Sequence, residues 1–79
     1  MMMEVYGKYN GMWGKLGKCD IKKNKVRQGL FDSNRFKKCS DFAYGENGYR
    51  RAFKFKNISQ SYESSDKIVV TLAKIEVMD

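Results

Sequence analysis

The side chains in this sequence that could do chemistry are two cysteines, scattered carboxylates and a large set of lysines and arginines. The chain has no histidine, so it lacks the usual general base near neutral pH and any Ser-His or Cys-His nucleophile pair. Cys19 and Cys39 stand twenty residues apart, and two cysteines alone cannot complete a four-ligand zinc site. No close carboxylate pair or phosphate-binding glycine loop is present. We therefore expect no enzyme activity, cofactor or metal site, with a nuclease built on Lys, Tyr and Glu as the catalytic alternative.

Positive charge is the strongest signal in the composition. Sixteen Lys and Arg residues stand against nine Asp and Glu, which gives a formal net charge of +7. Fourteen of the cations lie in residues 1–56, whereas residues 57–79 carry a small excess of acid. Such a balance favours nucleic acid, an anionic surface or an acidic protein patch as the partner. The alternative is that the lysines only keep the protein in solution.

The cations fall in three segments, which are a predicted hairpin, a predicted helix and a predicted strand. Lys and Arg neutralise phosphates and release counterions, which supplies most of the sequence-independent affinity for nucleic acids. Four aromatic residues could add base stacking if they are exposed, which would favour RNA or single strands: Tyr6, Tyr9, Trp13 and Tyr49. The alternative is that they belong to the core. The predicted nucleic-acid-binding residues are Lys22, Lys23, Lys25, Arg27, Arg35, Lys37, Lys38, Arg50, Arg51, Lys54 and Lys56.

The segment 49–58 has the alternation of a half-buried strand. Side chains alternate across a strand, so Phe53 and Phe55 point one way while Arg50, Lys54 and Lys56 point the other. This pattern predicts aromatic side chains in the core and a row of cations facing water.

The N-terminal part predicts three strands, at 3–9, 12–21 and 25–31. Asn10-Gly11 favours a type I′ turn between the first two, because both central residues of that turn need positive φ. Gly14 and Gly17 predict a bulge or a close backbone approach in the second strand. Residues 22–25 are a polar connection whose three lysines repel one another unless an anion compensates, the alternative being an ordinary solvated turn.

A helix is predicted from Asn34 to Tyr44. The short side chains at 32–34 can cap its start, and Phe36, Cys39 and Ala43 recur at helical spacing. Its three cations, at 35, 37 and 38, would then lie in the first turns, where they oppose the helix dipole. Binding explains them better than stability does.

The segment 67–77 is the most apolar one and is expected to lie beside 49–58. Val69, Ala73, Ile75 and Val77 form one face and Ile68, Val70 and Leu72 the other. A strand with two apolar faces is central or covered by a partner, so this strand is the candidate seam of a homodimer. The fold class expected is α+β, as a single domain over 1–79 with a small antiparallel sheet of about five strands, in the order β-β-β-α-β-β, packed by one short helix.

The start of the chain has neither the basic nor the apolar region of a signal peptide, and the longest apolar run, 68–73, is too short to span a bilayer. With only two cysteines we expect a cytoplasmic protein with reduced thiols and no contact with membranes.

In size, charge and general make-up, including the absence of histidine and proline, the chain resembles the small phage-encoded RNA-binding inhibitors of the ToxN ribonuclease toxin found in T4-like phages. The resemblance involves no shared motif and assigns no residue a role. It implies RNA-dependent binding to a host toxin–antitoxin complex in the cytoplasm of the host cell. The alternative is an inhibitor of another host factor that places its basic face on an acidic protein surface without nucleic acid.

Overall fold

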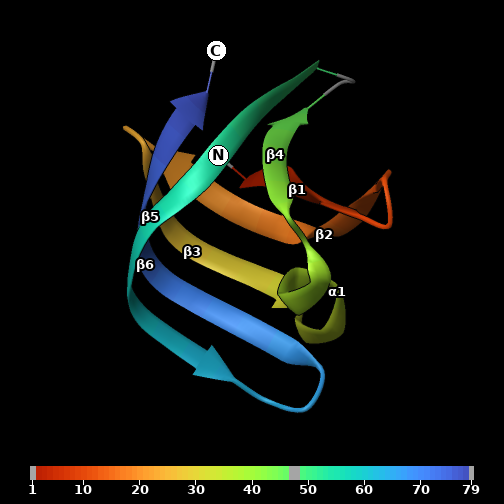
Figure 1. Cartoon of the computed structure of the whole chain (residues 1–79). Helices are drawn as coiled ribbons and strands as arrows, with labels where there is room; N and C mark the ends of the chain where they lie inside the picture. The colour runs from red at the N-terminus through yellow and green to blue at the C-terminus, as the bar shows by residue number, and fades with distance from the viewer. Residues whose placement is uncertain (1, 47–48, 79) are drawn as a thin grey trace.

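The computed structural model of the chain describes residues 2–46 and 49–78. In this part of the chain, six antiparallel strands close into a barrel and one short helix lies between the third and fourth strands (Figure 1). Around the barrel the strand order is β1-β2-β3-β6-β5-β4, and β4 pairs with β1. The elements are β1 (Met2–Tyr9), β2 (Met12–Lys22), β3 (Lys25–Asp32), α1 (Ser33–Lys38), β4 (Asp41–Glu46), β5 (Tyr49–Glu63) and β6 (Lys67–Met78).

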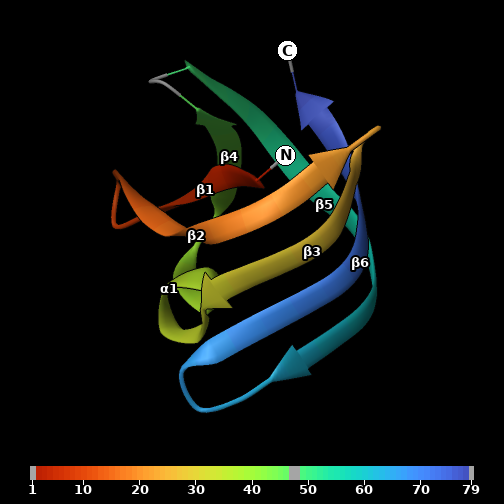
Figure 2. The same ribbon diagram turned by 180° about the vertical axis from the view of Figure 1, so that it is seen from behind.

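The first four strands form a Greek key. Hairpins join β1, β2 and β3, and the chain then returns across one end of the barrel so that β4 lies beside β1. Helix α1 belongs to this return. Cys39, which follows the helix, packs directly on β1 because Gly7 has no side chain, and a Cβ at Gly7 would overlap Cys39 Sγ. Seen from behind, β2, β3 and β6 form a continuous wall (Figure 2).

The expected α+β fold with about five strands is wrong. The segment predicted as the second half of the helix forms a sixth strand, β4, which pairs with β1 on one side and β5 on the other. The helix ends at Lys38, and Cys39 is already extended at φ −79° and ψ 134°. A six-residue helix gains little stability by itself, whereas the strand satisfies its backbone on both edges, so the tertiary pairing overrides the helical spacing.

The tight turn predicted at Asn10-Gly11 is confirmed, and residues 22–25 form the polar connection that was expected, with a turn type that was not predicted. Asn10 and Gly11 have φ of 52° and 73°, and Lys23 and Asn24 have φ of 52° and 60°, so each two-residue loop has the positive φ values of a type I′ hairpin. The predicted bulge is also confirmed, because the β1–β2 register shifts beside Gly17. A Cβ on Gly17 would lie 2.0 Å from the Leu30 carbonyl oxygen.

The start of the helix is confirmed, but the expectation that its three cations oppose the helix dipole is wrong. The backbone N–H of Arg35 donates to Asp32 Oδ1 at 3.0 Å, which caps the first turn. Because the helix has only six residues, Arg35, Lys37 and Lys38 occupy its last turn. Cations are favourable there, so their presence needs no explanation from binding.

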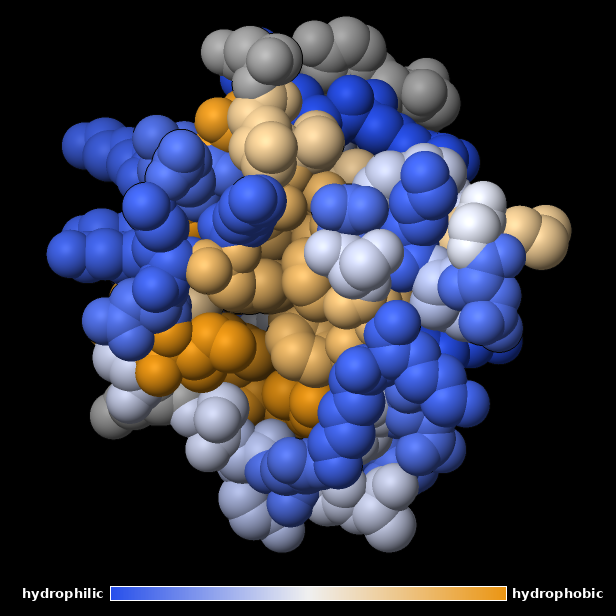
Figure 3. Space-filling model, in the orientation of Figure 1, coloured by the Kyte–Doolittle hydropathy of each residue, from blue (hydrophilic) through white to orange (hydrophobic). Residues whose placement is uncertain are grey.

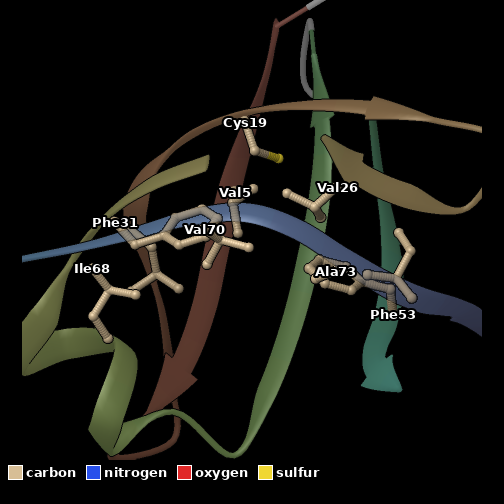
Figure 4. Packing of buried hydrophobic residues seen from close by; sticks show 10 residues of the cluster. Val5, Cys19, Val26, Phe31, Phe53, Ile68, Val70 and Ala73 are labelled. Carbon is tan, nitrogen blue, oxygen red and sulfur yellow. The ribbon is translucent and has the colours of Figure 1, made fainter. Parts of the chain in front are cut away.

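The core fills the barrel from all sides (Figure 4). Strand β6 contributes most to it and lies beside β5, as expected. The predicted division of β6 into two faces is wrong, because Val70 and Ala73 both point inward while the two residues between them are exposed. The buried residues of the core cluster are Val5, Leu16, Cys19, Val26, Phe31, Phe53, Ile68, Val70, Ala73 and Ile75, and Ala43 of β4 is buried as well.

Candidate nucleic-acid interface

Three lysines from three strands form a row on the outside of the barrel. Lys22 of β2 lies opposite Lys25 of β3, and Lys25 lies opposite Lys74 of β6. Asn57 of β5 continues the row beyond Lys74. Like charges placed directly opposite each other on neighbouring strands destabilise a sheet. Repulsion within this lysine row therefore lowers the stability of the fold.

The tip of the β2–β3 hairpin adds two more cations to the lysine row. We call the five residues Lys22, Lys23, Lys25, Arg27 and Lys74 the tip cluster. All five are exposed, and none forms an ion pair with any residue in the described part of the chain.

Two hollows of about 380 and 250 Å³ lie against the tip cluster. Both are lined by Lys25 and Leu72. The first also includes Arg27 and the other two hairpin lysines, while the second includes Lys74 with Asn57 and Ser59. The lining contains no carboxylate, so the surface suits an anion.

The hairpin is held in place against the neighbouring strand. The backbone N–H of Ile75 donates to the Asn24 carbonyl oxygen at 3.0 Å, which ties the β2–β3 turn to β6. This bond keeps the hairpin lysines beside Lys74. Lys74 was not predicted, because it belongs to the acidic C-terminal part of the sequence and meets the others only through the β3–β6 pairing.

The lysines of β5 face outward as predicted, but Lys56 is engaged in an ion pair, whereas the lysines of the tip cluster form none with the described residues. Phe53 is buried and Phe55 half-buried, whereas Lys54 and Lys56 are exposed. Lys56 Nζ pairs with Glu76 Oε2 at 2.8 Å, and this ion pair lowers the pKa of the Glu76 carboxyl and raises that of the Lys56 ammonium.

Arg50 and Arg51, at the start of β5, lie apart from the tip cluster. The guanidinium carbon of Arg50 stands 4.1 Å from the centre of the Tyr6 ring. The Tyr6 hydroxyl in turn donates to Glu4 Oε2 at 2.6 Å, and this bond raises the pKa of the Tyr6 phenol and lowers that of the Glu4 carboxyl. Arg51 is exposed and lies opposite Tyr44 of β4.

The helical cations lie at the other end of β3 from the hairpin tip. Seven residue steps of strand separate the two ends, which corresponds to about 23 Å. Arg35 Nη1 donates to the Lys15 carbonyl oxygen at 3.0 Å, and Lys37 pairs with Glu63, whose pKa it lowers. The eleven predicted cations therefore do not share one face, and only the four of the β2–β3 hairpin belong to the tip cluster.

The predicted stacking aromatics do not accompany the tip cluster. Arg50 covers one face of the Tyr6 ring, and the half-buried Tyr9 packs against Gly14. Trp13 is 41% exposed, but it lies near the β1–β2 turn at the opposite end of β2 from Lys22. The side chain of Tyr49 lies outside what the structure describes. The lining of the two hollows contains no aromatic residue.

The cysteine thiols are poorly suited to nucleophilic chemistry. Burial raises the pKa of the Cys19 thiol to about 12, and burial also raises the pKa of the half-buried Cys39 thiol. Both are free cysteines. Within residues 2–46 and 49–78, no cluster of three or more cysteine, aspartate or glutamate side chains is arranged to hold a metal ion.

Comparison of the chain with known protein families, with curated proteins and with solved structures finds no match. The described part of the chain contains no helix that is long and apolar enough to cross a membrane.

Proposed function

We propose that this protein is a non-enzymatic nucleic-acid-binding protein, with RNA as the leading ligand, and that it holds phosphates on the tip cluster. The observation that carries the proposal is the lysine row, in which Lys22, Lys25 and Lys74 face one another across three strands without a carboxylate among them. A bound polyanion offsets this repulsion and gains the entropy of released counterions.

The make-up of the tip cluster favours binding to the backbone over reading of bases. Lysine ammonium groups recognise phosphate as point charges, and the hollows beside them contain no aromatic ring on which a base could stack. We therefore expect affinity that depends weakly on sequence and steeply on salt.

The test is binding of a fluorescently labelled, unstructured RNA oligonucleotide, measured by anisotropy over a range of salt concentrations. The wild type should give a log–log slope of about −0.7 per phosphate contacted. The triple variant Lys22→Gln, Lys25→Gln, Lys74→Gln should lose at least tenfold in affinity. The control Lys8→Gln, Lys38→Gln, Lys67→Gln removes the same charge elsewhere and should bind almost as the wild type does. Equal losses in both variants would contradict the assignment of the site.

The resemblance in size and charge to phage inhibitors of ribonuclease toxins extends the proposal to a biological role. In that role the bound RNA would link the protein to a toxin–antitoxin complex of the host. Pull-down from host lysate with and without ribonuclease distinguishes the two modes of capture, because a partner bridged by RNA is lost on treatment.

An acidic protein surface is the alternative ligand of the tip cluster, since the cluster recognises charge alone. A partner that is retained after ribonuclease treatment and released by the triple lysine variant would favour this alternative.

We keep the homodimer in the proposal, but we place its interface on the outer face of the sheet and no longer along the whole of β6. Leu30, Val69 and Tyr62 lie side by side there on β3, β6 and β5. Leu30 is 50% exposed and Tyr62 67%. Light scattering on the wild type and on Leu30→Glu tests the association, and a monomeric wild type would exclude it. Val70 is fully buried, so a substitution there would test folding instead.

A further inference from the structure

The barrel is closed at only one end of the β4–β5 seam. The ladder between these strands runs from Glu46 and Tyr49 to Phe42 and Phe53, and there it stops. Beyond Phe53, the described residues of β5 pair only with β6. The other edge of β5, from Lys54 to Glu63, thus offers backbone N–H and C=O groups that no strand of the described chain occupies.

An apolar hollow of about 490 Å³ opens beside this free edge, between β5 and helix α1. Three phenylalanines, Phe36, Phe42 and Phe55, form its aromatic wall, with ring centroids 5.1 to 5.7 Å apart. Ile58, which is 38% exposed, and Ile68 complete the apolar lining. These side chains point toward the barrel interior, so the hollow is a part of the core that the split seam leaves uncovered.

Hydrophilic side chains flank the apolar surface on both sides (Figure 3). Lys37 lies at the rim of the hollow, paired with Glu63, and Lys38 follows it on the helix without an ion pair to any described residue. On the outer face of β5, Lys54 likewise forms no ion pair with the described residues, although it lies opposite Glu76. The charged residues that line the hollow are Lys37 and its partner Glu63, and the nearby cations without an ion pair to a described residue are Lys38 on the helix and Lys54 on the outer face of β5.

We propose that this hollow and the free edge of β5 form a docking site for a short, extended, acidic peptide segment of a partner protein. The segment adds a strand to the barrel at the split seam and places alternate apolar side chains against Phe36, Phe42 and Ile58. Its carboxylates meet the lysines of the rim. The segment is short because register shifts at three places bend β5 along this edge and limit the length of regular pairing.

This site is separate from the tip cluster. It is lined by inward-facing side chains at the open seam, whereas the tip cluster lies on the outside of β2, β3 and β6. Binding of peptide and binding of nucleic acid can therefore be measured and lost independently.

The probe is a fluorescein-labelled nine-residue peptide in which glutamate alternates with valine and phenylalanine, and anisotropy reports its binding. Two control peptides carry lysine in place of glutamate, or N-methyl groups on alternate backbone nitrogens. Each control should bind at least tenfold more weakly, because the first reverses the charge and the second removes the hydrogen bonds to the edge.

The protein variants Ile58→Glu and Tyr62→Glu add the same charge to inward- and outward-facing positions of β5. Ile58→Glu should weaken peptide binding at least tenfold, while Tyr62→Glu should leave it within about twofold. Ser61→Trp is a second variant that fills the hollow with an apolar side chain, and it should abolish binding while its circular dichroism spectrum and melting curve show a folded protein. Ser61 is exposed and lines the hollow, so the indole has room there.

Any one of four results would overturn the proposal. Absence of peptide binding to the wild type, or equal binding of all three peptides, excludes acidic strand addition. Self-association of the wild type that Ile58→Glu abolishes and Tyr62→Glu does not would make a second copy of the chain the occupant. Weaker binding of the RNA oligonucleotide to Ile58→Glu and Ser61→Trp, with peptide binding unaffected, would assign the hollow to nucleic acid.

Discussion

Replacing Lys25 with glutamine should stabilise the fold and weaken nucleic-acid binding at the same time. Lys25 is the centre of the lysine row and faces Lys22 on one side and Lys74 on the other. A pair of like charges directly opposite each other in a sheet costs about 0.2–1 kcal/mol. Removing the central charge relieves both pairs, so we expect the free energy of unfolding to rise by about 0.4–2 kcal/mol at low salt.

The gain should appear as a higher melting temperature. A stability increase of 1 kcal/mol raises the melting temperature of a domain of this size by about 4–8 °C. The gain should vanish at 1 M salt, where the Debye length of about 3 Å is shorter than the spacing of about 4.8 Å between neighbouring strands. Thermal unfolding followed by circular dichroism at both salt concentrations checks the expectation.

Binding should change in the opposite direction. Loss of one phosphate contact reduces the log–log salt slope by about 0.7 on a single strand. Lys38→Gln is the matched control, because Lys38 is an exposed cation at the far end of the barrel, and it should leave the slope unchanged. If Lys25→Gln leaves the melting temperature unchanged at low salt, the ammonium groups do not repel each other as the pairing implies. If the slope stays the same, the row does not hold phosphate.

Three further predictions concern the turn, the thiols and the ion pairs. Lys23→Asn should stabilise the protein by about 0.5–1 kcal/mol in urea denaturation, because Lys23 has φ of 52° and asparagine adopts positive φ at lower cost; an unchanged midpoint would contradict this. At pH 8 a disulfide reagent should modify Cys39 slowly, because burial raises the pKa of its thiol, and Cys19 only after unfolding, because it is fully buried with a pKa of about 12. Rapid reaction of both cysteines would show that the barrel opens readily. Lys37 and Lys56 lower the pKa values of Glu63 and Glu76 in the folded state, so the unfolded chain takes up protons first on acidification and the free energy of unfolding should fall as the pH drops below about 4.5. Urea denaturation between pH 3 and 7 measures this fall, and Glu76→Gln should reduce it. The same fall in the variant would exclude Glu76 as a source.

Features that depend on neighbours in the chain could be predicted from the sequence. The turn at Asn10-Gly11 needs two residues with positive φ, and the sequence supplies the pair that adopts them most easily. The alternation in 49–58 placed Phe53 inside and Lys54 outside, because the side-chain period of a strand is two wherever the strand pairs regularly. The cap at Asp32 likewise needs only a residue three positions away.

Helical spacing at Phe36, Cys39 and Ala43 was a misleading signal. The same residues also fit a short helix followed by a strand, and the spacing cannot distinguish the two. The choice depends on β1 and β5, which offer β4 a partner on each edge. Backbone hydrogen bonds to segments far away in the sequence decided it, and no local pattern records them.

The sequence by itself determined that the protein carries a large excess of positive charge, several hairpins and no histidine. Only the tertiary structure decided which charges meet. Lys74 lies 49 positions after Lys25 in an acidic part of the chain, yet the β3–β6 register places the two directly opposite each other. The split seam beside β5 has the same origin, because it depends on where the β4–β5 ladder stops. The packing of the whole barrel sets the strand register, and the register in turn decides which charges lie opposite each other and which strand edges stay unpaired.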